Sequence, residues 1–310
     1  MKLFLGIDGG QSGTAALIGD ETGRVLGHGE AGPCNHAAAA EGRAKLERAI
    51  SDSVAWACAQ AGLDPFTVEF EAACCGMSGG PDDKELILAR LLRVRKLVVT
   101  TDAAIALAGA TSNGQGIVVI AGTGSIGLGR DAEGRTARAG GWGYVFGDEG
   151  GAFDIARQAV RAALRMEEGW GPATALLRLL LEATESRSAN QLLHKLYGAD
   201  WPRPRAARLA PLVDRAAEEG DAVAVSILNA AAQELALVAA AVRGQLWKPE
   251  DAVEVAHIGG VFESRRVRER FRVLVELEQR NLVIAPLHSP AEGALAEAWR
   301  AAGVDCRLES

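Results

Sequence analysis

Short apolar runs separated by glycine-rich turns open the chain, and the same arrangement returns halfway along it. The first half begins with apolar residues 3–7, a glycine-rich turn at 8–14, and further apolar runs at 15–18 and 25–29 with a second turn between them. Tight glycine turns between short apolar runs are typical of antiparallel hairpins. The pattern therefore predicts three antiparallel strands at the start of the chain.

The second half repeats this order of strand, glycine turn, strand, acidic turn and strand. Apolar residues 117–121 precede the turn Gly122-Thr123-Gly124-Ser125, and runs at 126–129 and 136–140 lie on either side of a turn at 131–134. We interpret the repeat as an internal duplication, in which two α/β lobes face each other across a cleft.

The remaining segments predict helices and further strands. Helical patterns occupy 36–61, with Gly62 as the stop, much of 151–246, and 290–301, where a proline stands in the first turn. Short buried strands are expected at 71–76, 96–100 and 253–258, and a last strand at 282–285.

Composition and charge restrict the class of protein. The 310 residues are 48% hydrophobic and 24% charged, as in ordinary soluble proteins, and they suffice for two packed lobes. A formal net charge of −7 argues against a nucleic-acid-binding protein, which would need clustered Lys and Arg. The local basic run at 265–270 is expected to be a solvated helix face.

The location expected from the sequence is the cytoplasm. No secretory signal is visible, because Asp8 interrupts the first apolar run, and the longest apolar stretch, 235–242, is too short to cross a bilayer. The number of cysteines, five, is odd, and no pair of them has the CxxC spacing of metal sites. Such thiols suit a reducing compartment.

Two of the glycine-rich turns have the residues needed to bind phosphate. At 8–14 the glycines let an anion approach successive backbone N–H groups. The Asp8 carboxylate, at the end of the strand, fits a group that holds Mg²⁺ through water. The turn at 122–125 offers the same geometry with two hydroxyls. The first turn is not a P-loop, since a strand follows it and no Gly-Lys-Ser/Thr is present. A plain hairpin capped by Asp8 is the alternative.

Seven short motifs together resemble one branch of a known family. In chain order they are Asp8-Gly9-Gly10, Asn35-His36, Thr101-Asp102-Ala103, Gly122-Thr123-Gly124-Ser125, Gly140-Gly141-Trp142-Gly143, Gly147-Asp148-Glu149-Gly150 and Gly259-Gly260. With them the chain resembles the N-acetylglucosamine kinase branch of the BadF/BadG/BcrA/BcrD family, within the sugar kinase, Hsp70 and actin superfamily. The motifs keep the family's order and span almost the whole chain.

The resemblance implies the fold and the lobes. The fold class is α/β, a two-lobed actin-like ATPase (ribonuclease H-like) fold with duplicated lobes around a central cleft. The small N-terminal lobe would comprise residues 1–111 and 290–310, because the last helix would cross back to it. The large lobe would comprise residues 112–289.

The resemblance also implies which residues bind and react. ATP would be bound by Gly9, Gly10, Gln11, Ser12, Thr14, Gly122, Thr123, Gly124, Ser125, Gly259 and Gly260. The sugar would be bound by Asn35, Gly141, Trp142, Gly143 and Asp148. Asp102 would accept the proton of the attacking hydroxyl, and Asp8 and Asp102 would hold Mg²⁺ through water. His36 receives no role.

The function implied is ATP-dependent phosphorylation of an amino sugar at its 6-hydroxyl by a cytoplasmic homodimer, with N-acetylglucosamine as the first choice of acceptor. Glucosamine and N-acetylmuramic acid are alternative acceptors, because nothing in 151–246 identifies the substituent on the second carbon. A generic hexose kinase and a non-enzymatic ATP clamp are further alternatives. So is an ATP-driven activator of acyl-CoA dehydratases or reductases, with an iron–sulfur cluster on cysteines such as Cys74 and Cys75.

Simpler structural roles remain open for several of these residues. Thr101 or Asp102 could be a helix cap, and Asn35 a turn residue. Asp148 with Glu149 could place favourable charge at the start of the following helix. Trp142 is expected either behind the glycine segment or in the core. Gln11 stands where family members often have Gly or Thr, so the phosphate contacts of the first turn would differ in detail.

Overall fold

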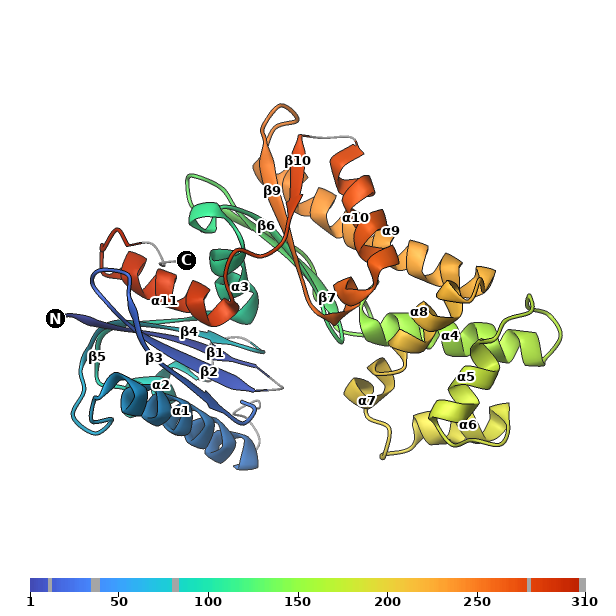
Figure 1. Ribbon diagram of the computed structural model, residues 1–310, viewed down its shortest axis with the longest axis horizontal. Coiled ribbons are helices and arrows are strands. Elements are labelled where there is room, and N and C mark those ends of the chain that lie inside the picture. Colours follow the sequence, from blue (N-terminus) through green and yellow to red (C-terminus); the bar gives the residue numbers. More distant parts are fainter. Residues whose placement is uncertain (11–12, 35–39, 80–83, 278–279, 307–310) are drawn as a thin grey trace. The chain divides into compact units, whose positions relative to one another are not determined.

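The computed structural model describes residues 1–10, 13–34, 40–79, 84–277 and 280–306. The chain divides into two compact units, unit 1 (Met1–Gly116 with Pro286–Ser310) and unit 2 (Ile117–Ala285). The divisions lie a few residues from the lobe boundaries expected at 111/112 and 289/290. Each unit holds one five-stranded sheet with its own helices (Figure 1).

The sheet of unit 1 has the strand order β3-β2-β1-β4-β5. Its strands are β1 (Leu3–Gly9), β2 (Thr14–Asp20), β3 (Val25–Ala31), β4 (Phe70–Met77) and β5 (Val94–Thr101). The first three strands pair antiparallel, as the glycine turns predicted, whereas β1, β4 and β5 run parallel. The carboxyl ends of the three parallel strands therefore lie at one edge of this sheet.

Alternate residues of β1 face two different helical layers. Leu3, Leu5 and Ile7 pack in one core with α1 (Ala40–Ala61), and Phe4 packs in a second core with α11 (Pro290–Ala301). All four side chains are buried, because both faces of the central strand are covered. The shorter helices α2 (Glu85–Leu91) and α3 (Asp102–Ala110) pack beside α1 and α11, respectively.

The expectation of a buried strand at 96–100 is wrong in one respect. The strand forms as β5, but its residues are half-buried or exposed, and Lys96 Nζ donates to the Ala301 carbonyl at 2.6 Å. β5 is the last strand in the sheet order, and an edge strand has only one neighbour to cover it. The strand expected at 71–76 is buried as predicted, as β4.

Unit 2 repeats the strand order of unit 1. Its strands β6 (Gly116–Ala121), β7 (Ser125–Arg130), β8 (Thr136–Gly140), β9 (Val253–Ile258) and β10 (Asn281–Ile284) lie in the order β10-β9-β6-β7-β8. With β6 in the place of β1, this is the order of the first sheet. β6, β9 and β10 run parallel, and β7 and β8 antiparallel. The repeat of strand, glycine turn, strand, turn and strand predicted along the two halves of the chain is confirmed, and the structure adds that the order of strands within the sheets repeats as well.

Helices fill the segment between β8 and β9, as the pattern over 151–246 predicted. They are α4 (Ala152–Glu167), α5 (Leu176–Ala183), α6 (Ala189–Tyr197), α7 (Arg203–Ala207), α8 (Ala210–Glu218) and α9 (Ala222–Leu246). A 3₁₀ turn, η2 (Gly260–Glu263), and α10 (Arg265–Leu277) follow β9, and a second 3₁₀ turn, η1 (Ser112–Gly114), precedes β6.

The long helix α9 is apolar over most of its length. Within the described ranges it is the single helix long and apolar enough to cross a bilayer by length and composition. The uninterrupted apolar run at 235–242 is shorter than the apolar helix, because polar residues such as Glu234 interrupt the helix sequence. Leu228, Leu235 and Val242 are buried in the core of unit 2, and α9 packs against α8, α10 and β7. We therefore interpret α9 as a core helix.

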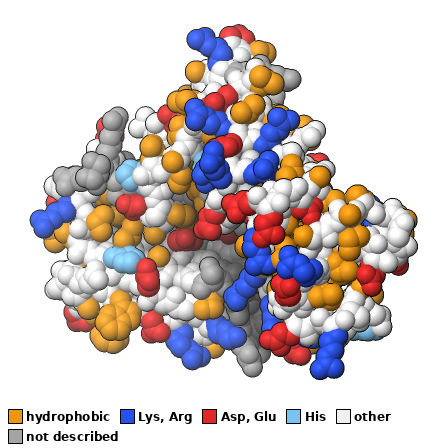
Figure 2. Space-filling view, turned by 45° about the vertical axis from the view of Figure 1, so that its right-hand side comes forward, with side chains coloured by type: hydrophobic (Ala, Val, Ile, Leu, Met, Phe, Trp, Pro, Cys, Tyr) orange, Lys and Arg blue, Asp and Glu red, His pale blue; other side chains and the backbone are white. Residues whose placement is uncertain are grey.

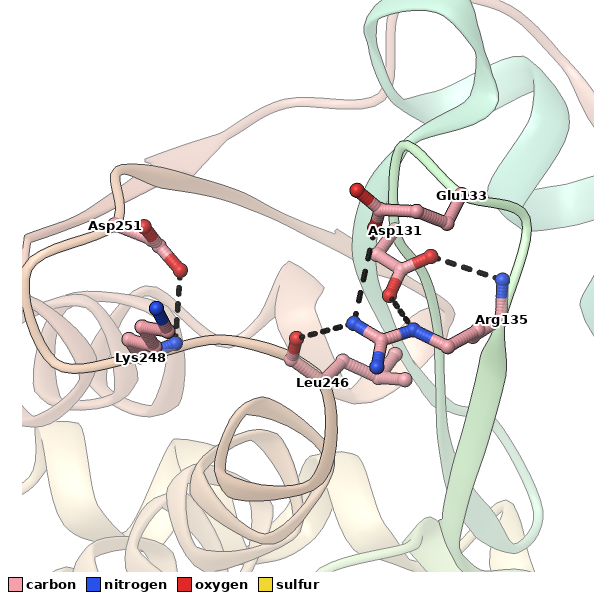
Figure 3. A network of polar contacts seen from close by, with 6 residues as sticks. All are labelled: Asp131, Glu133, Arg135, Leu246, Lys248 and Asp251. Carbon is pink, nitrogen blue, oxygen red and sulfur yellow. Dashed lines mark hydrogen bonds and ion pairs between the residues drawn. The ribbon is translucent and has the colours of Figure 1, made fainter.

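A polar network fastens the β7–β8 turn to the carboxyl end of α9 (Figure 3). Arg135 Nε donates to Asp131 Oδ2 at 2.6 Å, and Arg135 Nη2 donates to the Leu246 carbonyl at 3.4 Å. In the turn after α9, the Lys248 N–H donates to Asp251 Oδ2 at 2.8 Å. The last carbonyls of a helix lack helical partners, so the guanidinium of Arg135 satisfies one of them.

The basic run of α10 carries the ion pairs of a solvated helix face. Arg265 pairs with Glu269 at 2.7 Å and Arg272 with Glu276 at 3.1 Å, each pair one helical turn apart. Basic and acidic side chains are interspersed over the face of the molecule shown in Figure 2. Within the basic run at 265–270, Arg265 thus carries a surface ion pair, as expected of a solvated helix face.

We predict that Trp299 is a main anchor of α11 on the first sheet. Its indole is fully buried, lies 6.3 Å from the ring centre of Phe4, and donates to the Asp20 carbonyl at 2.9 Å. Trp299→Ala should lower the free energy of unfolding by about 3–5 kcal/mol, because it leaves a cavity and an unpaired carbonyl. Urea unfolding measures the loss. The matched control is Trp56→Ala at an exposed site on α1, and equal losses in the two variants would contradict this account.

Candidate active site

The two candidate carboxylates of unit 1 lie where its parallel strands end. In the strand register Asp8 of β1 is opposite Gly76 of β4, and Gly76 is opposite Thr100 of β5. Asp102 begins α3 directly after β5. Burial and, second, the charge of Asp102 raise the pKa of Asp8 to about 6. The structure therefore brings Asp8 and Asp102 within electrostatic reach of each other.

Thr101 is the N-terminal cap of α3, the helix that begins with Asp102. Its Oγ1 accepts the Ala104 N–H at 3.2 Å, so it takes the capping role that the sequence left open between two residues. Asp102 is the first helical residue and is half-buried, and its Oδ1 accepts the Ala103 N–H at 2.8 Å. A carboxylate at this position is favoured by the helix dipole. The role of Asp102 as a base stays a prediction.

Backbone hydrogen bonds hold the described part of the first glycine turn. The Gly10 N–H donates to the Gly13 carbonyl at 2.9 Å, and the Cys34 N–H donates to the Gly10 carbonyl at 2.9 Å. A methyl group on Gly9 would lie 2.7 Å from Met77 Sδ, so packing favours glycine there. The end of β3 and the turn are thereby tied together.

Thr14, expected to bind ATP, is engaged within the protein. It is buried, and its Oγ1 donates to the Gly32 carbonyl at 2.9 Å and lies 2.9 Å from Cys34 Sγ. In this structure it supports the segment after β3, and its contact with ATP stays a prediction. The other candidates of this region, Gln11, Ser12, Asn35 and His36, lie outside the described residues.

In unit 2 the turn at 122–125 connects β6 to β7 and rests on the start of α4. The Ala152 N–H donates to the Gly122 carbonyl at 2.8 Å, and the Phe153 N–H donates to the Thr123 carbonyl at 3.1 Å. The buried hydroxyl of Ser125 donates to the Glu149 carbonyl at 2.6 Å. Of the two hydroxyls expected to face phosphate, that of Ser125 is thus engaged within the protein.

The Gly259-Gly260 turn lies beside the turn at 122–125. In the parallel register Ile258 of β9 is opposite Ile120 of β6, so the two strands end together. Gly259 has a φ of +110°, and a methyl group on it would lie 3.0 Å from the Gly122 nitrogen. Only glycine fits this conformation and this close approach. The structure therefore brings together the two glycine turns of unit 2 that were predicted to bind ATP.

The Gly140–Gly143 segment has an unusual backbone and an exposed aromatic ring. Gly140, Gly141 and Gly143 have φ values of +71°, +71° and +80°. The indole of Trp142 is 71% exposed, and the guanidinium of Arg138 lies 4.7 Å from its ring centre. The expectation that Trp142 packs behind the glycines or in the core is wrong, because the left-handed backbone of Gly141 and Gly143, on either side of it, presents this residue to solvent.

Asp148 is a buried carboxylate with an ion-pair partner that the sequence did not reveal. Its Oδ2 pairs with Nη2 of Arg203, from the start of α7. The alternative role at the start of α4 does not apply to Asp148, because α4 begins at Ala152 and Asp154 is the acidic residue in its first turn. Arg203 lies 55 residues away in sequence, and only the contact in three dimensions identifies it.

The cysteines of β4 are poorly placed for an iron–sulfur cluster. Cys74 and Cys75 are fully buried, and burial, with the neighbouring Cys74 and Cys34, raises the pKa of the Cys75 thiol well above its usual range. Cluster ligands are thiolates, which such a setting disfavours. None of the five cysteines, all of which lie in the described part of the chain, forms a disulfide. This argues against the dehydratase-activator alternative.

The raised pKa of Asp8 predicts a pH-dependent effect of Asp8→Asn on stability. Below pH 4 the Asp8 carboxyl is protonated in both the folded and the unfolded chain. Between about pH 4 and pH 6 the unfolded chain ionises Asp8 while the folded chain keeps it protonated, because its pKa is raised to about 6, so the free energy of unfolding of the wild type falls over this range and stays lower above it. In the absence of ligands Asp8→Asn should therefore be more stable at pH 8, by about 1–3 kcal/mol, and equally stable near pH 4.

Urea titrations at several pH values measure this difference. Asp52→Asn, at an exposed site on α1, is the control and should show no such trend. A difference between Asp8→Asn and wild type that stays constant from pH 4 to pH 8 would show that Asp8 does not titrate as described.

Known proteins match this chain over nearly its whole length. The model of the BadF/BadG/BcrA/BcrD ATPase family matches residues 5–298. The N-acetylmuramic acid/N-acetylglucosamine kinase of Clostridium acetobutylicum is 33% identical over 302 residues, which cover 95% of this chain and 97% of that protein. The N-acetyl-D-glucosamine kinase of Dictyostelium discoideum is 29% identical and covers 86% of this chain and 87% of its own length.

A solved structure agrees in fold. A protein from Chromobacterium violaceum, provisionally named N-acetylglucosamine kinase, matches with a TM-score of 0.76 at 27% identity, over 95% of this chain and 98% of that one. The expected fold class, a two-lobed actin-like ATPase with α/β lobes, is confirmed. Since the family model matches residues 5–298 and the Clostridium acetobutylicum kinase is 33% identical over nearly the whole chain, the chain belongs to the BadF/BadG/BcrA/BcrD ATPase family.

Proposed function

We propose that this chain is an ATP-dependent sugar kinase that phosphorylates the 6-hydroxyl of an amino sugar, with Asp102 as general base. The pair of carboxylates Asp8 and Asp102 carries the proposal, because the charge of one contributes to the raised pKa of the other. A plain hairpin turn has no need of two neighbouring carboxylates. A kinase needs one to accept a proton and one to hold the metal ion of its nucleotide.

The glycine turns of unit 2 support binding of the nucleotide. Gly122 and Gly259 lie against each other, and each is followed by residues expected to contact ATP. A methyl group built on Gly122 or Gly260 would meet no described atom within 4 Å, so space for a ligand remains beside both. Backbone N–H groups on such turns bind phosphate oxygens without a side chain in the way.

In the proposed reaction the sugar 6-oxygen attacks the γ-phosphorus of ATP. The bond from that phosphorus to the β–γ bridging oxygen breaks, ADP leaves, and the hydroxyl proton passes to Asp102. Asp148 and the backbone at Gly141 and Gly143 would bind ring hydroxyls and so fix the acceptor for attack. Asn35 would contribute in the same way.

Asp8 and Asp102 are the residues that would hold Mg²⁺ through its water ligands. Carboxylate oxygens suit this ion, and a cation beside them would remove much of the cost of ionising Asp8, so the residues present fit the group. When bound, the ion would neutralise charge on the phosphates.

The relatives support an amino-sugar acceptor, since two of them are named for N-acetylglucosamine and one also for N-acetylmuramic acid. We therefore favour N-acetylglucosamine, with N-acetylmuramic acid and glucosamine as the alternatives. We also infer a cytoplasmic location, where cysteines that form no disulfide remain reduced. A homodimer stays a prediction from the resemblance.

Asp102→Asn should lower kcat by about 10²–10⁴-fold on the best amino sugar, because the proton acceptor is lost. The KM for Mg²⁺-ATP should also rise, because Asp102 would share in holding the metal ion. A coupled ADP-release assay with Mg²⁺-ATP measures both, on N-acetylglucosamine, glucosamine, N-acetylmuramic acid, N-acetylmannosamine and glucose.

The exposed Asp52→Asn is the control and should keep wild-type rates. ADP release by the wild type that does not depend on any of the sugars would refute the kinase and leave an ATP clamp. Full activity in folded Asp102→Asn would refute the assignment of the base.

A further inference from the structure

Arg203 is an ion-pair partner of Asp148 that the structure adds to the candidate site. Its Nη2 forms an ion pair with Asp148 Oδ2, and its Nε is buried without a hydrogen-bond partner among the described residues. The Arg203 side chain is 30% exposed and that of Asp148 only 9%. A carboxylate buried to this degree needs a cation or several donors beside it.

Two aromatic rings hold the guanidinium in place. The central carbon of Arg203 lies 5.2 Å from the ring centre of Tyr144 and 5.9 Å from that of Phe153. The two rings meet edge-on, with centres 5.4 Å apart. A planar guanidinium packs against aromatic faces while its N–H groups point outward, which an ammonium group does less well. The contacts explain why arginine stands here.

The ion pair lies against Gly124, and its acidic residue has an unusual backbone conformation. A methyl group on Gly124 would collide with Asp148 Oδ2 and lie 2.6 Å from Arg203 Nη2. Asp148 itself has a φ of +63°, which is unfavourable for a residue other than glycine. Such a conformation persists where its surroundings hold it, and functional sites are where it is most often found.

We propose that Arg203 is the positioning residue of the sugar site. It holds the Asp148 carboxylate against Gly124, so that this carboxylate is oriented toward the ring hydroxyls of the acceptor. The inference rests on the proposed function and deepens it. Arg203 acts through Asp148 and not on the transferred phosphoryl group. Its loss should therefore affect binding of the sugar far more than binding of ATP.

The test compares Arg203→Met with Arg205→Met in the full-length protein. Arg205, two residues further along α7, is exposed, and its guanidinium packs on Trp201 at 4.4 Å instead of reaching Asp148. Arg203→Met should raise the KM for the sugar by about 10- to 100-fold and leave the KM for ATP within about threefold. Arg203→Lys should recover part of the loss, and Arg205→Met should match the wild type.

Folded Arg203→Met with a sugar KM within about threefold of the wild type would overturn the proposal. So would equal rises in the KM for ATP and for the sugar. If Arg203→Met does not fold, the same comparison of the two KM values in Arg203→Lys decides.

A second measurement separates this claim from the proposed function. Absence of turnover by the wild type on every sugar refutes the kinase, and the pairing is then decided by urea unfolding of Arg203→Met, Asp148→Asn and the double variant. If the stability loss of the double variant differs from the sum of the two single losses, the ion pair is supported. Additive losses overturn it.

Discussion

The parallel pairing of the central strand of each sheet is the constraint on which the candidate site depends. In unit 1 the register of β1 with β4 and of β4 with β5 makes the three strands end together, which places Asp8 near Asp102. In unit 2 the register of β6 with β9 does the same for Gly122 and Gly259. Residues from distant parts of the chain thus meet at strand ends, the edge where ligands of α/β sheets commonly bind.

The same edges carry local costs that the surrounding structure offsets. Burial makes it costly to ionise the Asp8 carboxyl, and Asp148 adopts a left-handed backbone conformation. Neither feature helps the chain to fold, and the ion pair with Arg203 holds the Asp148 carboxylate in place. Costs of this kind are typical of sites selected for ligand binding rather than for stability.

Most of the framework could be predicted from the sequence, because it depends on local periodicity. β9 and α11 have the bounds expected, and α11 begins with a proline and a capping box of Ser289 and Glu292. Most of the features that the sequence did not reveal depend on distant neighbours. The pairing of Arg203 with Asp148, the edge position of β5, and the engaged hydroxyls of Thr14 and Ser125 all follow from the pairing of segments far apart in the chain, which no local pattern records. The exposure of Trp142 follows instead from the positive φ of the glycines beside it, which the residue pattern alone does not fix.

The chemical position of the transferred phosphate tests the central claim most directly. The product of the best acceptor would be analysed by phosphorus–proton correlation spectroscopy after incubation of the protein with ATP and Mg²⁺. The account predicts a single phosphate ester whose phosphorus couples to the two protons on the sixth carbon of the amino sugar. Phosphorus recovered only as inorganic phosphate, or an ester at another carbon, would contradict it.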